Sequence, residues 1–274
     1  MEESMKLGEV EVEGVKLAYR EAGYGRPCLV LIHGALGSSL SWIHQLKMAE
    51  CGGLRALALD LPGHGGSWDV EDGCETIADL AKLVEGFIEA LGLEPAVLVG
   101  HSMGGAVALT IAVQSPRLVE ALVLANTGAK LGVLKEILEG LEHDYERAVV
   151  ELIAPMAFSP SASKELVEAS IKEMLMVPQR VALRNFKACD SFDLRGRLGN
   201  VEAPTLIIAS SDDKLTPVKW AEYLRDNIKG SRLVVIEGAG HASMLERPRE
   251  FNEALANFLR GLSRPPGLSL NERS

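Results

Sequence analysis

A serine between two glycines, at the junction of two apolar runs, constrains the fold of this chain more than any other feature. Residues 96–99 read Ala-Val-Leu-Val, Gly100–Gly104 read GHSMG, and a second apolar run covers 106–113. This order predicts a strand, a sharp turn and a helix, with the Ser102 hydroxyl exposed at the C-terminal edge of a sheet. The flanking glycines are needed because the strained turn brings neighbouring backbone too close for side chains. The pentapeptide alone is a weak signal, but its place between a strand-like and a helix-like run makes it a strong one.

Apolar runs of strand length alternate with helical patterns on both sides of this turn. An alternating pattern over residues 10–20, centred on Glu13-Gly14, predicts an antiparallel hairpin. Near-continuous apolar strands need cover on both faces, so their alternation with helices predicts a parallel sheet between two helical layers. Further strands are expected at 28–32, 54–59, 96–99, 119–125, 205–209 and 233–236, and helices at 76–91, 103–114, from Pro217 onward and at 248–260.

The clearest helix pattern covers residues 76–91, whose apolar side chains fall on one helical face. Thr76 and Asp79 form a variant of the capping box at its start. Gly92 suits the residue that ends such a helix. This segment is therefore expected to be an amphipathic helix packed on the sheet.

The alternation stops between about Gly128 and Leu198, where only helical periodicity is found. Pro178 is expected at the first position of one helix there, and an apolar stripe marks another at Val167, Ile171, Met174 and Leu175. This stretch therefore predicts a helical insertion between two parts of the sheet. The residues after Gly261 are expected to be loose.

Composition excludes several classes of partner. The 274 residues include 28 Lys and Arg against 38 Asp and Glu, a formal net charge of −10, which argues against nucleic acids and anionic membrane surfaces. No apolar stretch approaches 18 residues, and the amino terminus lacks the apolar segment of a signal peptide. We expect a cytoplasmic protein that acts on a small molecule; the sequence does not indicate an oligomeric state.

The four cysteines are scattered, with no spacing typical of a metal site, and are expected to be reduced and mostly buried: Cys28, Cys51, Cys74 and Cys189. No phosphate-binding loop and no dinucleotide fingerprint is found either. The sequence thus predicts neither a cofactor nor a metal.

With these motifs together, the chain resembles the α/β-hydrolase family, in the form that carries a helical cap. The resemblance covers about residues 8–127 and 200–261, and its motifs follow the family's order of nucleophile, acid and histidine. It implies a mostly parallel eight-stranded sheet with helices on both faces. The core would comprise residues 1–127 and 200–274, and residues 128–199 would form the cap, or lid.

The resemblance implies that Ser102 is the nucleophile and that His241, in the segment Glu237–Pro248, is its general base and acid. A free serine hydroxyl needs such a base, because it is a poor nucleophile near neutral pH. Two adjacent aspartates precede Pro217. The family places the acid four residues before this proline, which favours Asp213 over Asp212 as the residue that orients His241.

Some relatives carry the acid after the sixth strand instead, but this chain has Asn126-Thr127 there. The backbone N–H groups of Met103 and Ala35 are the expected oxyanion donors, the second by resemblance. Three further histidines are interpreted as structural: His33 at a strand exit, His64 packing a scaffold loop, and His101 ordering the turn around Ser102.

These residues predict a serine hydrolase that cleaves a small, largely apolar carboxylic ester through an acyl-enzyme on Ser102. One alternative keeps the enzyme and changes the bond to that of a lactone, an amide, a peracid or a carbon–carbon bond. Carbon–carbon hydrolases of the family commonly have asparagine and tryptophan where this chain has His101 and Ala242, which weakens that option.

Another alternative is a ligand receptor with an intact triad and negligible turnover. A dehalogenase is excluded, because its nucleophile is an aspartate. Five apolar residues of the cap segment either line the substrate pocket or pack the cap helices, and the sequence leaves both readings open: Met156, Phe158, Met174, Met176 and Phe186.

Overall fold

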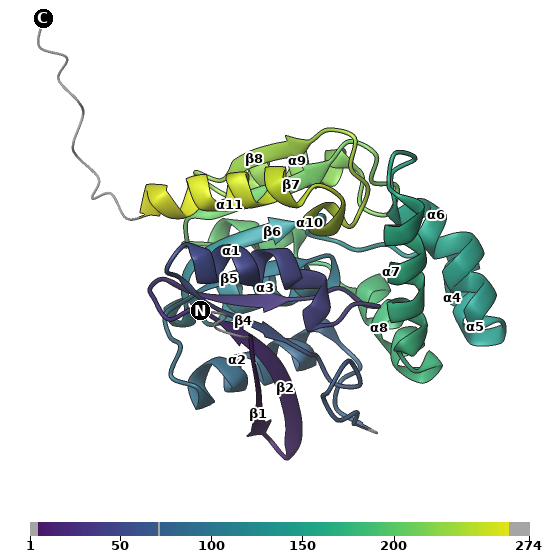
Figure 1. Cartoon of the computed structure of the whole chain (residues 1–274), viewed down its shortest axis with the longest axis horizontal. Helices are drawn as coiled ribbons and strands as arrows, with labels where there is room; N and C mark the ends of the chain where they lie inside the picture. The colour runs from purple at the N-terminus through teal and green to yellow at the C-terminus, as the bar shows by residue number, and fades with distance from the viewer. Residues whose placement is uncertain (1–4, 71, 263–274) are drawn as a thin grey trace, which may run out of the picture.

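Eight strands form one sheet in the order β1-β2-β4-β3-β5-β6-β7-β8 in the computed structural model, which describes residues 5–70 and 72–262 (Figure 1). Strand β2 runs antiparallel to both of its neighbours, β1 and β4, and every other neighbouring pair is parallel. The prediction of an eight-stranded, mostly parallel sheet is confirmed. The strands are β1 (Lys6–Val12), β2 (Val15–Ala22), β3 (Cys28–Ile32), β4 (Arg55–Leu59), β5 (Ala96–His101), β6 (Val119–Ala125), β7 (Thr205–Ser210) and β8 (Arg232–Ile236).

Helices cover both faces of the sheet, because alternate residues of its central strands pack to opposite sides. Val30 and Ile32 of β3 belong to the core formed with α2 (Ile77–Ala90), α3 (Met103–Gln114) and α9 (Val218–Asn227). Leu29 and Leu31 belong to the core under α1 (Ile43–Cys51) and α11 (Pro248–Leu262). Helix α9 begins one residue later than expected, with Pro217 as its N-cap. Four short helical segments complete this part: η1 (Ser39–Trp42), η2 (Pro116–Leu118), η4 (Arg195–Asn200) and α10 (Ser243–Glu246).

The turns and caps follow the local sequence. The β1–β2 hairpin turns at Glu13 and Gly14, both with positive φ, as a two-residue turn of the favoured twist requires. Thr76 caps α2: its Oγ1 accepts the Asp79 N–H at 3.2 Å, and Asp79 Oδ2 accepts the Thr76 N–H at 2.9 Å. The predicted capping box is therefore confirmed.

A group of helices lies between β6 and β7 in the sequence and gathers at one end of the molecule (Figure 1). The chain leaves and rejoins the sheet region at one place, because Lys130 and Asp193 are bridge partners and the Leu194 N–H donates to Ala129 O at 2.7 Å. We call this group the inserted helices: α4 (Lys135–His143), α5 (Tyr145–Arg147), the π-helical η3 (Ala148–Ile153), α6 (Ala154–Ala157), α7 (Lys164–Met176) and α8 (Gln179–Ser191).

Pro178 is the N-cap of α8 and not its first helical residue, because its ψ of 137° is extended. The tail that the sequence predicts to be loose lies outside the described residues, which end at position 262.

The cysteines are free thiols; three of them are buried, and Cys51 is exposed. Within the described part of the chain, no helix combines the length and apolarity needed to cross a membrane.

Candidate functional site

Ser102 lies at a strained turn between β5 and α3. Its backbone has φ 53° and ψ −117°, and its N–H donates to Ala125 O at 3.0 Å. A Cβ atom at Gly100 would collide with Gly104 O, and one at Gly104 with Ile32 O. Both glycines are therefore required by close backbone approach, as the sequence predicted. The turn presents Ser102 at the carboxyl edge of the parallel strands.

Asp213 and His241, which follow β7 and β8, form a close polar pair. His241 Nδ1 lies 2.8 Å from Asp213 Oδ2, which also accepts the Thr216 hydroxyl at 2.6 Å. The N–H groups of Leu215 and Thr216 donate to Asp213 Oδ1 at 2.9 and 2.8 Å. Burial disfavours the charged carboxylate, but attraction to His241 and these hydrogen bonds outweigh burial and lower the pKa of Asp213 to about 2. An ionised Asp213 leaves His241 Nε2 as the nitrogen free to accept a proton.

Asp212 lies in a different environment from Asp213. Its Oδ2 accepts the Ser159 hydroxyl at 2.9 Å and its Oδ1 the Ser211 hydroxyl at 3.0 Å. Its own N–H donates to Ala239 O at 2.9 Å. Asp212 thus ties the loop after β7 to the inserted helices, and Asp213 is the aspartate beside His241.

Asn126, at the end of β6, is a site residue that sequence reasoning used only to exclude an acid there. It has a positive φ of 46°, and its Nδ2 donates to Asp213 Oδ2 and Ser210 Oγ at 2.9 Å each. Its Oδ1 accepts the Ser243 hydroxyl at 2.6 Å. Asn126 therefore supports the Asp213 carboxylate from the neighbouring strand. The sequence holds one signal for Asn126: asparagine tolerates the left-handed conformation, and it stands here at the end of a strand.

Ser102 and His241 line one cavity of about 430 Å³, which we call the Ser102 cavity. Within the described residues the Ser102 hydroxyl has no hydrogen-bond partner, and the N–H groups of Ala35 and Met103 donate to no protein acceptor. Ala35 also lines the cavity, in a turn closed by the Gly37 N–H to Gly34 O bond at 3.0 Å. The hydroxyl, the imidazole and the unused Ala35 N–H thus lie at one cavity, and the Met103 N–H belongs to the residue that follows Ser102.

The other walls of the Ser102 cavity are mainly apolar. They include four of the five apolar residues singled out from the sequence: Met156, Phe158, Met174 and Phe186. Met176 does not line it and is 78% exposed. An apolar space with a few polar groups at one end is typical of a small-molecule site.

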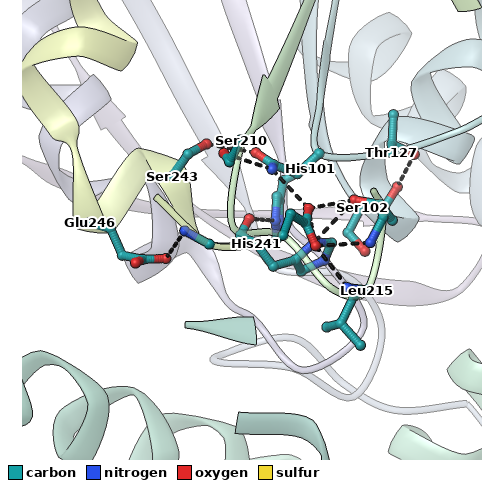
Figure 2. Close-up of polar contacts among 12 residues, drawn as sticks. His101, Ser102, Thr127, Ser210, Leu215, His241, Ser243 and Glu246 are labelled. Carbon is teal, nitrogen blue, oxygen red and sulfur yellow. Dashed lines mark hydrogen bonds and ion pairs between the residues drawn. The ribbon is translucent and has the colours of Figure 1, made fainter. Parts of the chain in front are cut away.

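His101 links the turn at Ser102 to the loop that carries His241. Its Nε2 donates to His241 O at 2.8 Å, and the two rings lie 4.6 Å apart between centroids (Figure 2). Burial, reinforced by the nearby His241, lowers the pKa of His101 to about 3, so the ring is neutral near pH 7. His101 therefore orders the histidine loop as well as the turn.

His33 and His64 hold the loop that contains Ala35. His33 Nδ1 donates to Gly34 O at 2.8 Å, and His64 Nδ1 donates to Gly37 O at 2.8 Å. His64 Nε2 in turn accepts Asn185 Nδ2 of α8 at 2.8 Å. Burial lowers the pKa of both histidines, which matches their neutral hydrogen-bonding roles.

The segment after α6 is bonded to the histidine loop. The His241 N–H donates to Ala157 O at 2.6 Å, and Glu246 accepts the Ser159 N–H at Oε2 and the Gly240 N–H at Oε1, both at 3.0 Å. Burial raises the pKa of Glu246 despite these hydrogen bonds. Sequence reasoning missed Glu246, because no local pattern shows that its partners converge.

Comparisons with known proteins show similar sequences and structures. Residues 29–254 match the sequence model of the Alpha/beta hydrolase family. A solved structure of a thermophilic esterase is 38% identical with a TM-score of 0.83, covering 95% of this chain and 99% of that chain. The enol-lactonase of Burkholderia xenovorans LB400 is 25% identical with a TM-score of 0.86, covering 92% and 100%. A candidate carbamate hydrolase, RutD, of Variovorax paradoxus is 31% identical, covering 86% of this chain and 93% of that relative.

Proposed function

Because this chain belongs to the α/β-hydrolase family, we propose that it is a serine hydrolase that cleaves a small, largely apolar carboxylic ester. The observation that carries the proposal is His241, which lies 2.8 Å from Asp213 and lines one apolar cavity together with Ser102. The ester specificity is supported by the likeness to a thermophilic esterase at 38% identity.

In the proposed reaction, His241 Nε2 takes the proton of Ser102 Oγ as the oxygen attacks the ester carbonyl. Asp213 holds the Nδ1 proton and stabilises the imidazolium that forms. The N–H groups of Ala35 and Met103 donate to the oxyanion of the tetrahedral intermediate. His241 then gives the proton to the departing alcohol, which leaves an acyl group on Ser102. Water, activated by the same imidazole, releases the acid and restores the serine.

We further propose that residues 128–199 act as the cap over this site, while residues 1–127 and 200–274 form the core. The support is that the inserted helices leave the core at one place and supply cavity walls such as Met156 and Phe158. The cap would shape the space for the alcohol and acyl parts of the substrate. The proposed chemistry needs no cofactor, because a side-chain nucleophile, a base and oxyanion donors suffice for acyl transfer.

The test combines a fluorophosphonate label with ester turnover. The label is expected on Ser102 by mass spectrometry, and Ser102→Ala is expected to lower kcat by about 10⁶-fold. Ser170→Ala, which removes another serine of the cavity wall, is the matched control and is expected to keep most activity. Unchanged ester turnover by Ser102→Ala would refute the proposal, and a single turnover followed by a stable complex would indicate a ligand receptor.

A lactone is the second candidate substrate, favoured by the likeness to the enol-lactonase. The same attack on a lactone carbonyl opens a ring, so that alcohol and acid leave as one product. Parallel kcat/KM values for short linear esters and for lactones of matched carbon number separate the two. A higher value for the lactones would reassign the substrate while leaving the roles of Ser102 and His241 intact.

A further inference from the structure

A second cavity of about 420 Å³ lies among the inserted helices. Its walls come from η3, α6 and α7 and are mainly apolar: Val150, Ala154, Pro155, Val167 and Ile171. The polar part of the wall comes from Ser159, Lys164, Glu168 and Lys214. The cavity therefore suits an apolar group more than a charged one.

Helix α7 separates the second cavity from the Ser102 cavity. Leu166 and Ser170 line the Ser102 cavity, whereas Val167 and Ile171 line the second one. None of the 13 residues of α7 is buried. A helix bordered by two cavities makes a thin partition between them.

Phe158 and Lys214 line both cavities, so the ring of Phe158 is part of the wall between them. The backbone on each side of Phe158 is held, since Ala157 O accepts the His241 N–H at 2.6 Å and the Ser159 N–H donates to Glu246 at 3.0 Å. The ring, only 5% exposed, packs with Ala242 beside His241. Phe158 therefore stands at the boundary between the two spaces.

The position of Phe158 also indicates which part of an ester reaches the second cavity. The departing alcohol oxygen must lie near His241 Nε2 to receive its proton. Phe158 is bonded through its neighbours to the loop that carries His241, and it packs on Ala242. We infer that the alcohol part of a bound ester extends toward Phe158.

We propose that the second cavity binds the distal end of a long, unbranched alcohol chain, and that Phe158 limits how easily the chain enters. The inference rests on the proposed ester hydrolysis at Ser102 and names its substrate class as esters of long-chain primary alcohols. Each methylene removed from water strengthens binding by about fourfold, so a chain that spans both cavities gains over one confined to the first.

The first experiment measures kcat/KM for two series: acetates of alcohols from butyl to decyl, and ethyl esters of acids of the same lengths. Val167→Phe fills the second cavity from its own side, and is expected to lower the decyl-to-butyl acetate ratio about tenfold. The ethyl ester series is expected to keep its ratio. The matched control is Glu165→Phe, which introduces the same side chain at an exposed position of α7 that lines neither cavity.

Phe158→Ala tests the partition. It is expected to raise the decyl-to-butyl acetate ratio about tenfold, and adding Val167→Phe is expected to cancel the gain. If Val167→Phe changes neither series, or changes only the ethyl ester series, the assignment of the second cavity to the alcohol chain is overturned.

A binding measurement separates this inference from the proposed function. Calorimetry of decyl acetate with Ser102→Ala is expected to give a Kd about tenfold lower than with the Ser102→Ala, Val167→Phe double variant. Equal Kd values overturn the inference even if short esters are hydrolysed. A tenfold difference without turnover of any ester by the unmodified protein would refute the hydrolase and keep the chain subsite.

Discussion

Asn126 and Asp213 lie at the carboxyl ends of neighbouring strands, and the Asn126 side-chain amide donates to Asp213 Oδ2 at 2.9 Å. The same carboxylate oxygen lies 2.8 Å from His241 Nδ1. The amide therefore supports the acid without touching the imidazole. A neutral donor at this place favours the ionised form of Asp213, which the proposed mechanism requires.

Replacing the Asn126 amide by a carboxylate should disturb the ionisation of Asp213. Asn126→Asp keeps the size and the tolerance of a positive φ, but places a like charge against Asp213. The two carboxylates would share a proton, so Asp213 would lose its own proton only at a higher pH. Activity would therefore be lost at a higher pH on the acid side of the pH profile. We expect kcat at pH 6 to fall about tenfold or more, with recovery at higher pH. Profiles of kcat against pH check this, with exposed Asn227→Asp as the control; superimposable profiles contradict it.

The two adjacent aspartates should differ sharply in kinetics. Asp213→Asn removes the group that holds the Nδ1 proton of His241, and kcat is expected to fall by about 10⁴-fold. Asp212→Asn leaves that pair intact, since Asp212 bonds Ser159 and Ser211, and a change of no more than a few fold is expected. Steady-state kinetics of both variants test the assignment. A larger loss in Asp212→Asn than in Asp213→Asn would reverse it.

Glu246 should affect kcat indirectly, because it helps to hold the loop that positions His241. In Glu246→Gln only one side-chain oxygen remains to accept the Gly240 and Ser159 N–H groups, so the histidine loop is held less firmly. We expect kcat to fall about tenfold while KM changes little, because no atom of Glu246 lines the Ser102 cavity. The measurement is a full kinetic curve beside that of Glu250→Gln, whose side chain is exposed. A change in KM alone would contradict a positioning role.

Stability should fall in acid partly because of His101. An unfolded histidine takes up its proton near pH 6.5, whereas folded His101 does so only near pH 3. The unfolded state binds more protons between these values, so the free energy of unfolding decreases as the pH falls, by up to about 1.4 kcal/mol per pH unit for one such group. We expect His101→Asn to lose less stability than the unmodified chain between pH 7 and pH 4.

Urea unfolding at several pH values checks this prediction, with the exposed His143→Asn as the control. The control should keep the pH dependence of the unmodified chain. Equal pH dependence in His101→Asn and the unmodified chain would mean that other groups dominate acid unfolding.

The sequence predicted those features that depend on local patterns. The strands follow from the alternation of apolar runs with helical patterns. The cap of α2 follows from Thr76 and Asp79, and the turn at Ser102 follows from its flanking glycines. The resemblance to the family, which places the acid four residues before the proline, favoured Asp213, the aspartate that lies beside His241 in the structure. Each of these signals lies within a few residues of the feature it predicts.

Other features depend on contacts between distant segments and escaped the sequence. Asn126 meets Asp213 because β6 and β7 are neighbours, and Glu246 meets Ser159 because α6 ends over the histidine loop. Helix α1 was not expected either, since Gln45 is buried among its apolar residues and weakens the pattern. Such residues become recognisable when the strand order is known.

The single exit and return of the chain at Lys130 and Asp193 has a consequence for protein engineering. Exchanging the intervening segment for that of a homologue would leave the backbone path of the sheet untouched. The exchange is not free, however, because the acceptor for the His241 N–H is Ala157 O, within the exchanged piece. A chimaera would therefore need a donor segment that restores this carbonyl, as well as the Ser159 bonds to Glu246 and Asp212, to keep the loop of His241 in place.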